Sequence, residues 1–325
     1  TAGAAQFMIN ALKISVALAA APGREAALYE QLVQVTFNQI REAAPEGRVL
    51  CAVSGGVDSA VCARLASLAV GDRLMCVFVD TGLFRQGEPE SVISTFMDAM
   101  GLVVAHVDAS EAFLRALSGV RSRDDKERIA AQLMTQVLIK QLGYDPGIRA
   151  IVLGANLNDA LFGFSTSAEM ESVKSAYNLC VCEPVRDLFK EEVRRLATAL
   201  SLPDSIALRQ PFPASGLALR IFGQVTPERL AVLRAADACF SEEIREGGYA
   251  KRLWQYYTNL VDSPDQPGTY AVSLRALQVS QGGAMAARLA FDVLERASER
   301  IRSEVKGVAR VVYDLTPSNH YGEME

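Results

Sequence analysis

Short apolar runs and amphipathic segments alternate along the chain from about residue 46. The apolar runs are RVLCAV (48–53), LMCVFVD (74–80), LVVAHVD (102–108) and RAIVLGAN (149–156), and helix-like segments separate them at 57–69, 89–100 and about 111–142. Nearly continuous apolar strands are typical of parallel sheets, which helices cover on both faces. The pattern predicts an α/β fold with a doubly wound parallel sheet, in which ligands bind at the carboxyl ends of the strands.

A different pattern begins around residues 202–220, where three prolines interrupt any regular element. Beyond it we expect a helix that starts at Thr226, a helix near 251–261 containing Trp254, Tyr256 and Tyr257, a strand at 269–280, a helix at 287–305 and a final strand, VARVVYDLT (308–316). This is a small α+β unit. We therefore predict an N-terminal helical extension (1–45, with its helix at about 24–43), a nucleotide-binding domain (46–208) and a C-terminal α+β domain (209–325).

Composition narrows the class of protein. The chain has 325 residues and a formal net charge of −5, which gives no general attraction to phosphate backbones and disfavours nucleic acid as a partner. No apolar run reaches the roughly 20 residues of a membrane-spanning helix. The six cysteines are scattered through apolar segments without a disulfide framework, which predicts reduced thiols and a cytoplasmic location.

The sequence SGGVDS (54–59) connects the first predicted strand to the first predicted helix. Gly55 and Gly56 let backbone amides approach a bulky anion at the positive end of the helix. Ser54 and Ser59 add hydroxyl donors, and Asp58 suits a Mg²⁺ ion that the phosphates share. The lysine and the spacing of the nucleoside-triphosphatase loop are missing. The alternative interpretation is a glycine turn that only connects strand to helix.

SGGVDS after a strand resembles the pyrophosphate-binding motif of the N-type ATP pyrophosphatases. Longer stretches resemble the synthetase portion of GMP synthetases: VLCAVSGGVDSAVCARL, GDRLMCVFVDTGLFRQGE, HVDASEAFLRALSGV, EPVRDLFKEEVRRLATALSLPDSIALRQPFPASGLALRIFGQVTPERL and EVKGVARVVYDLT. The resemblance covers nearly the whole chain after residue 45. The family's glutaminase domain has no counterpart here, so ammonia would be free or would come from a separate glutaminase subunit.

The resemblance assigns residue roles. It implies that 46–208 is an ATP-pyrophosphatase domain and that 209–325 binds the acceptor and forms a homodimer. The residues implied to bind ATP are Ser54, Gly55, Gly56, Val57, Asp58, Ser59, Val79, Gly82, Gly154 and Lys174. Asp58 and Asp159 would hold Mg²⁺, and with Lys174 they would be the catalytic residues. The residues implied to bind the acceptor are Arg85, Arg209, Gln210, Pro213, Gly216, Arg310, His320 and Glu323.

The implied reaction activates a carbonyl group. The oxygen of XMP or a related oxo-purine attacks the α-phosphorus of ATP, pyrophosphate leaves, and ammonia then replaces the adenylated oxygen with release of AMP. Backbone amides, Lys174 and Mg²⁺ would stabilise the charge on the departing pyrophosphate, so no covalent enzyme intermediate is needed.

The sequence departs from the family on the acceptor side. The family's lid carries a lysine, a serine, two histidines and an asparagine, whereas residues 174–178 read KSAYN, without either histidine. The lysine near the family's C-terminus, which would bind the acceptor's phosphate, has no counterpart in TPSNHYGEME. Losing such a contact would cost about 1.5–3 kcal/mol. These departures disfavour XMP itself, so the expected acceptor stays open between XMP and a related oxo-heterocycle.

Two alternatives remain. Cys180 and Cys182 could insert sulfur with a sulfur donor, because related ATP pyrophosphatases use the same adenylation for that purpose, although a buried apolar strand face also explains their spacing. The missing lid histidines and C-terminal lysine also permit a non-catalytic nucleotide-binding descendant.

Overall fold

The structure is a computed structural model that describes residues 25–155, 177–207, 209–210, 212–213, 215–280 and 283–317. Internal contacts divide the chain into two compact units. The first unit consists of residues 1–79, 90–107 and 134–209, and the second of residues 80–89, 108–133 and 210–325. Two segments of the N-terminal half therefore belong to the second unit. The domain boundaries at residues 45 and 208 stay a prediction.

A five-stranded sheet in the order β3-β2-β1-β4-β5 forms the centre of the first unit. Its strands are β1 (Arg48–Val53), β2 (Leu74–Asp80), β3 (Val104–Asp108), β4 (Ile148–Val152) and β5 (Cys180–Cys182). β1 pairs in parallel with β2 and with β4, and β4 pairs in parallel with β5. The carboxyl ends of these strands therefore lie along one edge of the sheet. The predicted α/β fold with a parallel sheet is confirmed.

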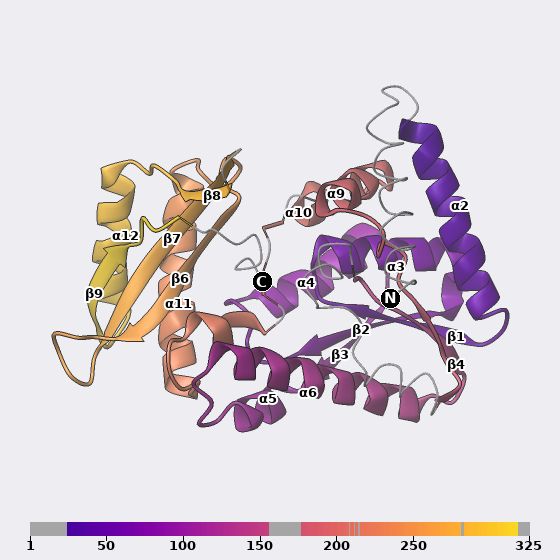
Figure 1. Ribbon diagram of the computed structural model, residues 1–325, viewed down its shortest axis with the longest axis horizontal. Coiled ribbons are helices and arrows are strands. Elements are labelled where there is room, and N and C mark those ends of the chain that lie inside the picture. Colours follow the sequence, from indigo (N-terminus) through magenta and orange to yellow (C-terminus); the bar gives the residue numbers. More distant parts are fainter. Residues whose placement is uncertain are drawn as a thin grey trace, which may run out of the picture. The chain divides into compact units, whose positions relative to one another are not determined.

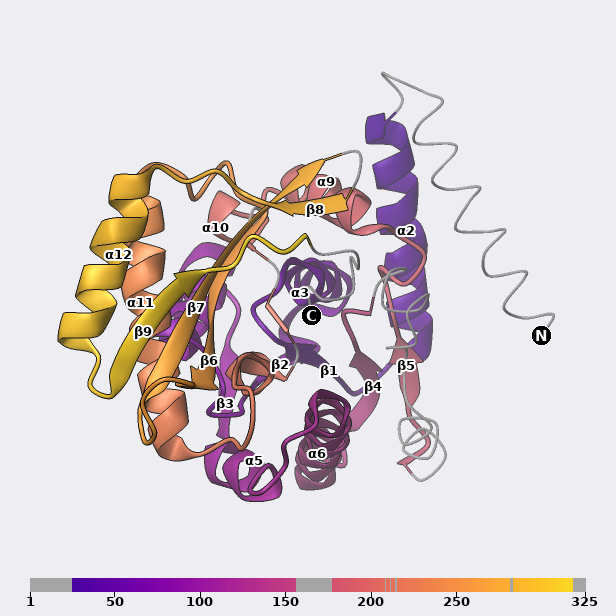
Figure 2. The same ribbon diagram turned by 60° about the vertical axis from the view of Figure 1, so that its left-hand side comes forward.

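Helices lie over both faces of this sheet, with α3 on one face and the C-terminal half of α6 on the other (Figures 1 and 2). The helices of this part of the chain are α2 (Glu25–Ala43), α3 (Val57–Val70), α4 (Glu88–Ser94), α5 (Ser110–Ala116), α6 (Arg123–Tyr144), α9 (Lys190–Ala199) and α10 (Asp204–Ala207), with short turns η1 (Gly71–Arg73) and η2 (Thr95–Ala99). The helix expected over 111–142 is two helices. The chain leaves the helix after Ala116, and Gly119 in the connection has φ +80°, which is not helical. Before the second helix, the Ser122 hydroxyl accepts a hydrogen bond from the amide of Asp125 at 3.4 Å.

Helix α3 is buried along most of its length. Its sequence, VDSAVCARLASLAV, is rich in small apolar residues, and it packs between β1, α2 and α9. Small side chains let a helix approach its neighbours closely on every side, so this helix has no wide polar face. The buried packing fixes the first turn of α3 against the end of β1.

The second unit contains a four-stranded sheet with two helices on one face (Figures 1 and 2). The strands are β6 (Gln255–Asp262), β7 (Tyr270–Ser280), β8 (Gly283–Ala286) and β9 (Val308–Tyr313), and the helices are α11 (Pro227–Glu246) and α12 (Phe291–Glu304). β7 pairs antiparallel with β6 and β8 and parallel with β9. Thr226 caps α11 by accepting from the amide of Arg229 at 3.1 Å, as expected.

The helix expected near 251–261 is wrong, because this segment is strand β6. Tyr256, Tyr257 and Thr258 belong to the residue types that favour strands, and all eight residues of β6 pair with β7. Hairpin pairing with an adjacent strand outweighs a helical apolar pattern of this length. The expected strand at 269–280, the helix at 287–305 and the final strand are present as β7, α12 and β9.

A buried carboxylate connects α11 to α12. Glu243 is 2% exposed, and its two oxygens lie 2.9 Å from Arg296 Nε and 3.1 Å from Arg300 Nη1. Arg300 also contacts Glu242 at 2.7 Å. These ion pairs align the two helices with each other.

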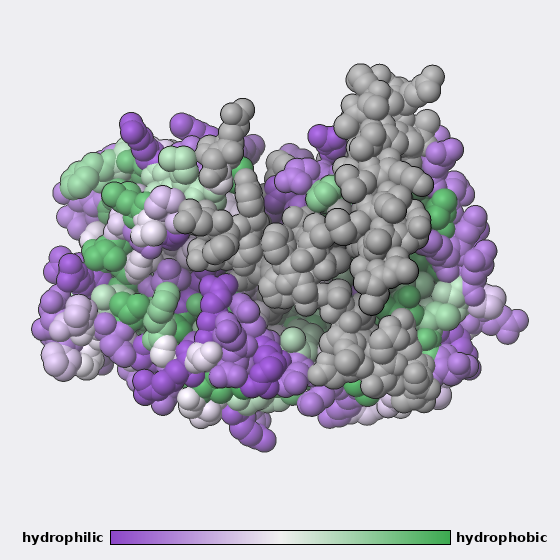
Figure 3. All heavy atoms as spheres, viewed as in Figure 1, coloured by the Kyte–Doolittle hydropathy of each residue, from purple (hydrophilic) through white to green (hydrophobic). Residues whose placement is uncertain are grey.

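No helix within the described residues is long and apolar enough to cross a membrane. On the face seen in Figure 3, hydrophilic side chains predominate among the described residues and hydrophobic ones are interspersed. All six cysteines are free thiols, four of them buried. The cytoplasmic location stays a prediction.

Lys126, on α6, is 2% exposed. Its ammonium group donates hydrogen bonds to the carbonyls of Ala218 (3.1 Å) and Ile221 (2.6 Å), at the end of the short helix η3 (Gly216–Arg220). Burial, and then the nearby charge of Arg229, lower the pKa of Lys126 from 10.5 to about 8. The lysine therefore stabilises the end of η3 while its charge is partly penalised by burial.

Because burial lowers the pKa of Lys126, we expect the free energy of unfolding to depend on pH. Between pH 8 and 10.5 the folded protein loses the Lys126 proton before the unfolded chain does, so this lysine favours folding more as the pH rises. We expect wild type to gain up to about 3 kcal/mol of unfolding free energy relative to Lys126→Met between pH 7 and pH 10. Urea denaturation at both pH values measures this difference. Lys140→Met, an exposed lysine of the same helix, serves as the control, and an equal, pH-independent difference for both variants would contradict the prediction.

Candidate functional site

The loop between β1 and α3 forms a compact turn held by two serines. The Ser59 hydroxyl accepts a hydrogen bond from the amide of Ser54 (3.1 Å) and donates to the carbonyl of Gly56 (3.0 Å). It also lies 3.2 Å from the Ser54 hydroxyl. Val57 begins α3 directly after the loop, so the free amides of the first helical turn and the positive end of the helix lie at this loop. Such an arrangement suits the binding of an anion.

Two glycines, one in this turn and one at the end of the neighbouring strand, let the backbone pack closely here. Gly55 has φ +80°, and a Cβ atom there would collide with Val92 and Arg209. Gly154 follows β4 on the neighbouring strand, and a Cβ atom there would lie 2.7 Å from the amide nitrogen of Ser59. The end of β4 therefore lies directly against the first turn of α3. A side chain at either position would displace the loop.

Asp58 is 8% exposed, and its two carboxylate oxygens have different environments. Oδ2 forms an ion pair with the ammonium group of Lys190 on α9, whereas Oδ1 is buried and has no hydrogen-bond partner in the described part of the chain. A buried carboxylate oxygen that lacks a donor is destabilising unless a ligand satisfies it. Carboxylate oxygens are the ligands that Mg²⁺ prefers, so Asp58 suits a magnesium ion.

Arg209, which follows α10, contacts the loop of residues 54–59. Its Nη1 atom donates to the carbonyl of Gly55 at 2.6 Å, and the Arg209 carbonyl lies 3.4 Å from Nη2 of Arg194 on α9. The sequence predicted Arg209 as an acceptor ligand, but in the structure its side chain contacts the predicted ATP loop. Its role toward an acceptor stays a prediction.

Val79 and Gly82, predicted beside the adenine, lie where β2 ends. Val79 is buried, and the amide of Gly82 donates to Asp80 Oδ1 at 2.8 Å. The next amide, of Leu83, donates to the Thr81 hydroxyl at 3.2 Å. These side chain to backbone hydrogen bonds shape the turn that leads to Arg85.

Within the second unit, two distant segments converge on the start of β6. Arg85 Nη2 donates to the carbonyl of Tyr256 at 3.0 Å, and the amide of Tyr256 donates to Gln210 Oε1 at 2.9 Å. Phe212 stacks on Phe84, with ring centroids 6.3 Å apart, and lies 5.2 Å from the Arg85 guanidinium. Arg85 and Gln210, separated by more than a hundred residues in sequence, therefore flank one backbone unit.

The remaining predicted acceptor residues do not lie together in the chain. Pro213 and Gly216 lie in the same segment as Gln210, where the amide of Gly216 donates to the Pro213 carbonyl at 2.8 Å and the next amide, of Leu217, donates to the Leu83 carbonyl at 2.7 Å. Arg310 is half-exposed on β9 and pairs with Asp265 at 2.7 Å. Asp159, Lys174, His320 and Glu323 lie outside the described residues.

Cys180 and Cys182 lie on β5, at the edge of the sheet. Cys180 is exposed and Cys182 is half-buried, so the pair does not form the buried apolar face that its spacing suggested. Burial, with a smaller effect of Cys180, raises the pKa of Cys182 to about 11. At neutral pH the Cys182 thiol is therefore protonated and weakly nucleophilic.

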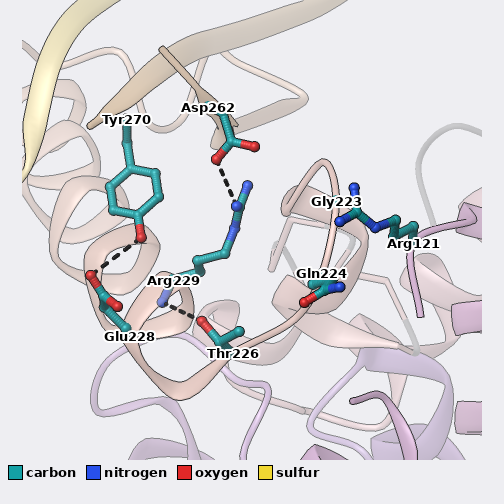
Figure 4. A pocket seen from close by; sticks show the side chains of 8 residues that line it. All are labelled: Arg121, Gly223, Gln224, Thr226, Glu228, Arg229, Asp262 and Tyr270. Atoms are coloured by element: carbon teal, nitrogen blue, oxygen red, sulfur yellow. Dashed lines mark hydrogen bonds and ion pairs between the residues drawn. The ribbon is translucent and has the colours of Figure 1, made fainter. Parts of the chain in front are cut away.

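A polar pocket of ≈ 240 Å³ lies in the second unit at the start of α11 (Figure 4). It is lined by Arg121, Gly223, Gln224, Thr226, Glu228, Arg229, Asp262 and Tyr270, none of which the sequence predicted as a site residue. Arg229 pairs with Asp262 at 2.7 Å, and the Tyr270 hydroxyl donates to Glu228 Oε1 at 3.3 Å. Because these charges neutralise one another, this pocket is a weak candidate for binding an anion.

Sequence reasoning missed Lys190. A lysine in the first turn of a helix opposes the helix dipole, and here it is the first residue of α9, followed by Glu191 and Glu192. An unfavourable cation at that position is a signal that it serves a purpose other than helix stability. The same reasoning from sequence also missed Asp237 and Arg234, which contact the 82–85 segment from α11.

Two family models and several relatives match this chain. The family model described as NAD synthase matches residues 28–230, and the model described as GMP synthase C terminal domain matches residues 242–320. The glutamine-hydrolysing GMP synthase of Symbiobacterium thermophilum is 42% identical over 306 residues, and those of Bacillus cytotoxicus and Carboxydothermus hydrogenoformans are 39% identical over 304 and 305 residues. In each case the match covers 88% of this chain and 59% of the relative.

The chain therefore spans somewhat more than half the length of these relatives. Among solved structures, the NMN synthetase from Francisella tularensis matches with a TM-score of 0.46 and 19% identity, over 58% of this chain and 77% of that chain. The NAD synthase match covers most of the first unit, including the loop of residues 54–59, and extends into the second unit as far as residue 230. The GMP synthase match covers residues 242–320 of the second unit. The resemblance found in the sequence is confirmed: the chain belongs to the ATP-pyrophosphatase family that the NAD synthase model describes, and it combines that region with a GMP synthase C-terminal domain.

Proposed function

We propose that this chain is an ATP-dependent synthetase that adenylates a carbonyl oxygen of XMP or a related oxo-purine and then replaces that oxygen with ammonia. The observation that carries the proposal is the loop of residues 54–59, where two serines, the start of α3 and the unsatisfied oxygen of Asp58 meet. The relatives named GMP synthase support the choice of acceptor. The products are AMP, pyrophosphate and an aminated purine.

The residues of the loop bind the leaving group. The amides after Gly55 and the hydroxyl of Ser54 would donate hydrogen bonds to the β- and γ-phosphates, and Lys190 would supply a positive charge. Ser59, whose hydroxyl proton goes to the Gly56 carbonyl, would hold the loop in the shape that binds them. Charge builds on the pyrophosphate as the bond to the α-phosphorus breaks. Donors that are already in place before this charge develops need no reorganisation, which lowers the barrier.

Asp58 would hold Mg²⁺ through its unsatisfied Oδ1 atom, together with Asp159 from outside the described residues. The ion would neutralise phosphate charge and orient the triphosphate. The Lys190 ammonium also contributes to neutralising Asp58, through the ion pair with Oδ2. Lys174, also outside the described residues, is proposed as a second cation for the phosphates.

Residues of the second unit would bind the acceptor. Arg85 and Gln210 flank the Tyr256 backbone, and Phe84 and Phe212 provide flat apolar surfaces beside them. A planar oxo-purine requires a similar combination of hydrogen-bond donors and apolar surface. Pro213 and Gly216 would shape this segment, and Arg310, His320 and Glu323 complete the proposed acceptor set.

Ammonia would be free or delivered by a glutaminase, as the names of the glutamine-hydrolysing relatives suggest. A homodimer through the second unit belongs to the same proposal. The exposed apolar side chains of Val279, Met285, Val312 and Leu315, on or next to strands β7 to β9, support it.

The main prediction concerns product formation. With ATP, Mg²⁺, ammonia and XMP, we expect pyrophosphate and AMP to appear in equal amounts and faster than without XMP, because the acceptor oxygen must attack for pyrophosphate to leave. A coupled phosphate assay and chromatography of AMP measure both products. No acceleration by XMP would contradict the XMP proposal, and no release with any oxo-purine would favour a non-catalytic nucleotide-binding protein.

Lys190 provides a second prediction. Lys190→Ala should raise the KM for ATP by about ten- to a hundredfold, because it removes a charge-assisted contact to the phosphates. Lys190→Arg should retain most of the affinity. Steady-state kinetics with ATP as the varied substrate provide the measurement, and Lys140→Ala, an exposed lysine of α6, is the matched control. An unchanged KM for ATP in Lys190→Ala would exclude a phosphate contact.

The sulfur alternative is tested with the cysteines. Cys180 is exposed and could react, whereas the raised pKa of Cys182 argues against it as a nucleophile. We expect the double variant Cys180→Ser, Cys182→Ser to retain ammonia-dependent turnover. Pyrophosphate release measured with a sulfide donor in place of ammonia provides the comparison. Sulfide-dependent product that disappears in the double variant would support sulfur insertion instead.

A further inference from the structure

Helix α11 holds the segment that carries Arg85. Arg234, on this helix, donates to the carbonyl of Gly82 and, through Nε, to the carbonyl of Phe84 at 2.8 Å. The carbonyl between them, of Leu83, accepts from the amide of Leu217 at 2.7 Å. Three consecutive carbonyls are thus bound by the second unit. The backbone before Arg85 has little freedom to move.

One ion pair, without hydrogen-bond geometry at Nε, and one hydrogen bond hold the Arg85 side chain. Nε lies 3.1 Å from Asp237 Oδ2, and Nη2 donates to the carbonyl of Tyr256 at 3.0 Å. No described residue hydrogen-bonds to Nη1. Because the guanidinium group is planar and rigid, fixing two of its nitrogens determines where the third one points. The side chain of Arg85 retains 17% exposure.

Asp237, three residues after Arg234 on α11, is 1% exposed. Its Oδ1 atom accepts from the amide of Thr258 at 3.0 Å and lies 3.3 Å from the Thr258 hydroxyl, while Oδ2 faces Arg85. Both oxygens are therefore engaged, and β6 determines the orientation of the carboxylate. Burying an ion pair contributes little net stability compared with apolar residues of similar size. What the pair provides is a defined orientation of its two members.

Glu243 gives an internal comparison, because it is a second buried carboxylate on the same helix. Its partners, Arg296 and Arg300, lie on α12 and connect the two helices. Asp237 instead pairs with Arg85, which the resemblance to GMP synthetases implies to contact the acceptor. The two carboxylates share burial and charge but differ in what they orient.

We propose that Asp237 is a positioning residue that holds the Arg85 guanidinium so that its Nη1 edge meets an oxygen of the acceptor. This inference rests on the proposed function and assigns a role to a residue of α11 that does not itself touch the acceptor. Thr258 assists by orienting the Asp237 carboxylate. The acceptor group that fits is an anionic or carbonyl oxygen, because Nη1 can only donate hydrogen bonds.

The first test is structural and needs no activity. In protein with ¹⁵N-labelled arginine, the Nε–Hε signal of Arg85 is identified by its loss in Arg85→Lys. Asp237→Asn keeps an oxygen for Thr258 but removes the charge opposite Arg85. We expect the Arg85 signal of this variant to shift, with averaging of its Nη signals, while the signals of Arg296 and Arg300 stay in place. An unchanged Arg85 signal would overturn the proposal.

The second test separates positioning from a purely structural role. In Asp237→Asn the KM for XMP should rise about ten- to a hundredfold, while the KM for ATP stays unchanged. Thr258→Val should act in the same direction and less strongly, and it serves if Asp237→Asn does not fold. Glu243→Gln is the matched control, because it should lower the melting temperature without changing the ratio of the two KM values.

The double variant completes the test. If Asp237 acts through Arg85, then Arg85→Gln with Asp237→Asn should have the same kcat/KM for XMP as Arg85→Gln alone. Multiplying losses, or equal changes in the KM values for XMP and ATP, would overturn the proposal. A wild-type protein that neither binds nor converts any oxo-purine would overturn the proposed function as well, whereas an active wild type with an unaffected Asp237→Asn would overturn this inference alone.

Discussion

The burial of α3 against the central sheet is the constraint on which the candidate ATP site depends. The helix is surrounded by β1, α2 and α9, and the end of β4 lies against its first turn at Gly154. With the helix start held on several sides, the short loop between β1 and α3 has little conformational freedom. The serine hydrogen bonds and the positive φ of Gly55 follow from that short connection. The amides of the first turn are thereby available to an anion.

An ion pair between buried or half-buried groups lies at the candidate site of each unit, taken separately. Asp58 pairs with Lys190 in the first unit, and Asp237 pairs with Arg85 in the second. Such pairs gain little stability because each charge loses its hydration. Their effect is to orient side chains before a ligand arrives, which reduces the reorganisation needed on binding. The two pairs differ in what remains available: a carboxylate oxygen in one, a guanidinium nitrogen in the other.

The second unit combines residues from three parts of the sequence. Its segment 80–89 follows directly from β2 of the first unit, yet its carbonyls and its arginine are bound by α11, β6 and the 210–220 segment. A candidate acceptor site therefore depends on the fold of the C-terminal region although Arg85 lies early in the chain. The GMP synthase match over residues 242–320 includes strand β6, which contacts Arg85 and Gln210.

The order of apolar strands and amphipathic helices predicted the parallel sheet, and the glycines and serines of residues 54–59 predicted the turn that connects β1 to α3. Both depend on local sequence and on the short link between one strand and one helix. Strand β6 was mistaken for a helix because its apolar pattern is short and ambiguous, and antiparallel pairing with the adjacent strand β7 decides its conformation. The partners of the site residues were out of reach of reasoning from the sequence. Lys190 pairs with Asp58 across 132 residues of sequence, and Asp237 pairs with Arg85 across 152. Both pairs result from the packing of elements that are distant in the sequence. A charged residue in a sequence does not reveal which opposite charge it will face once both are removed from water.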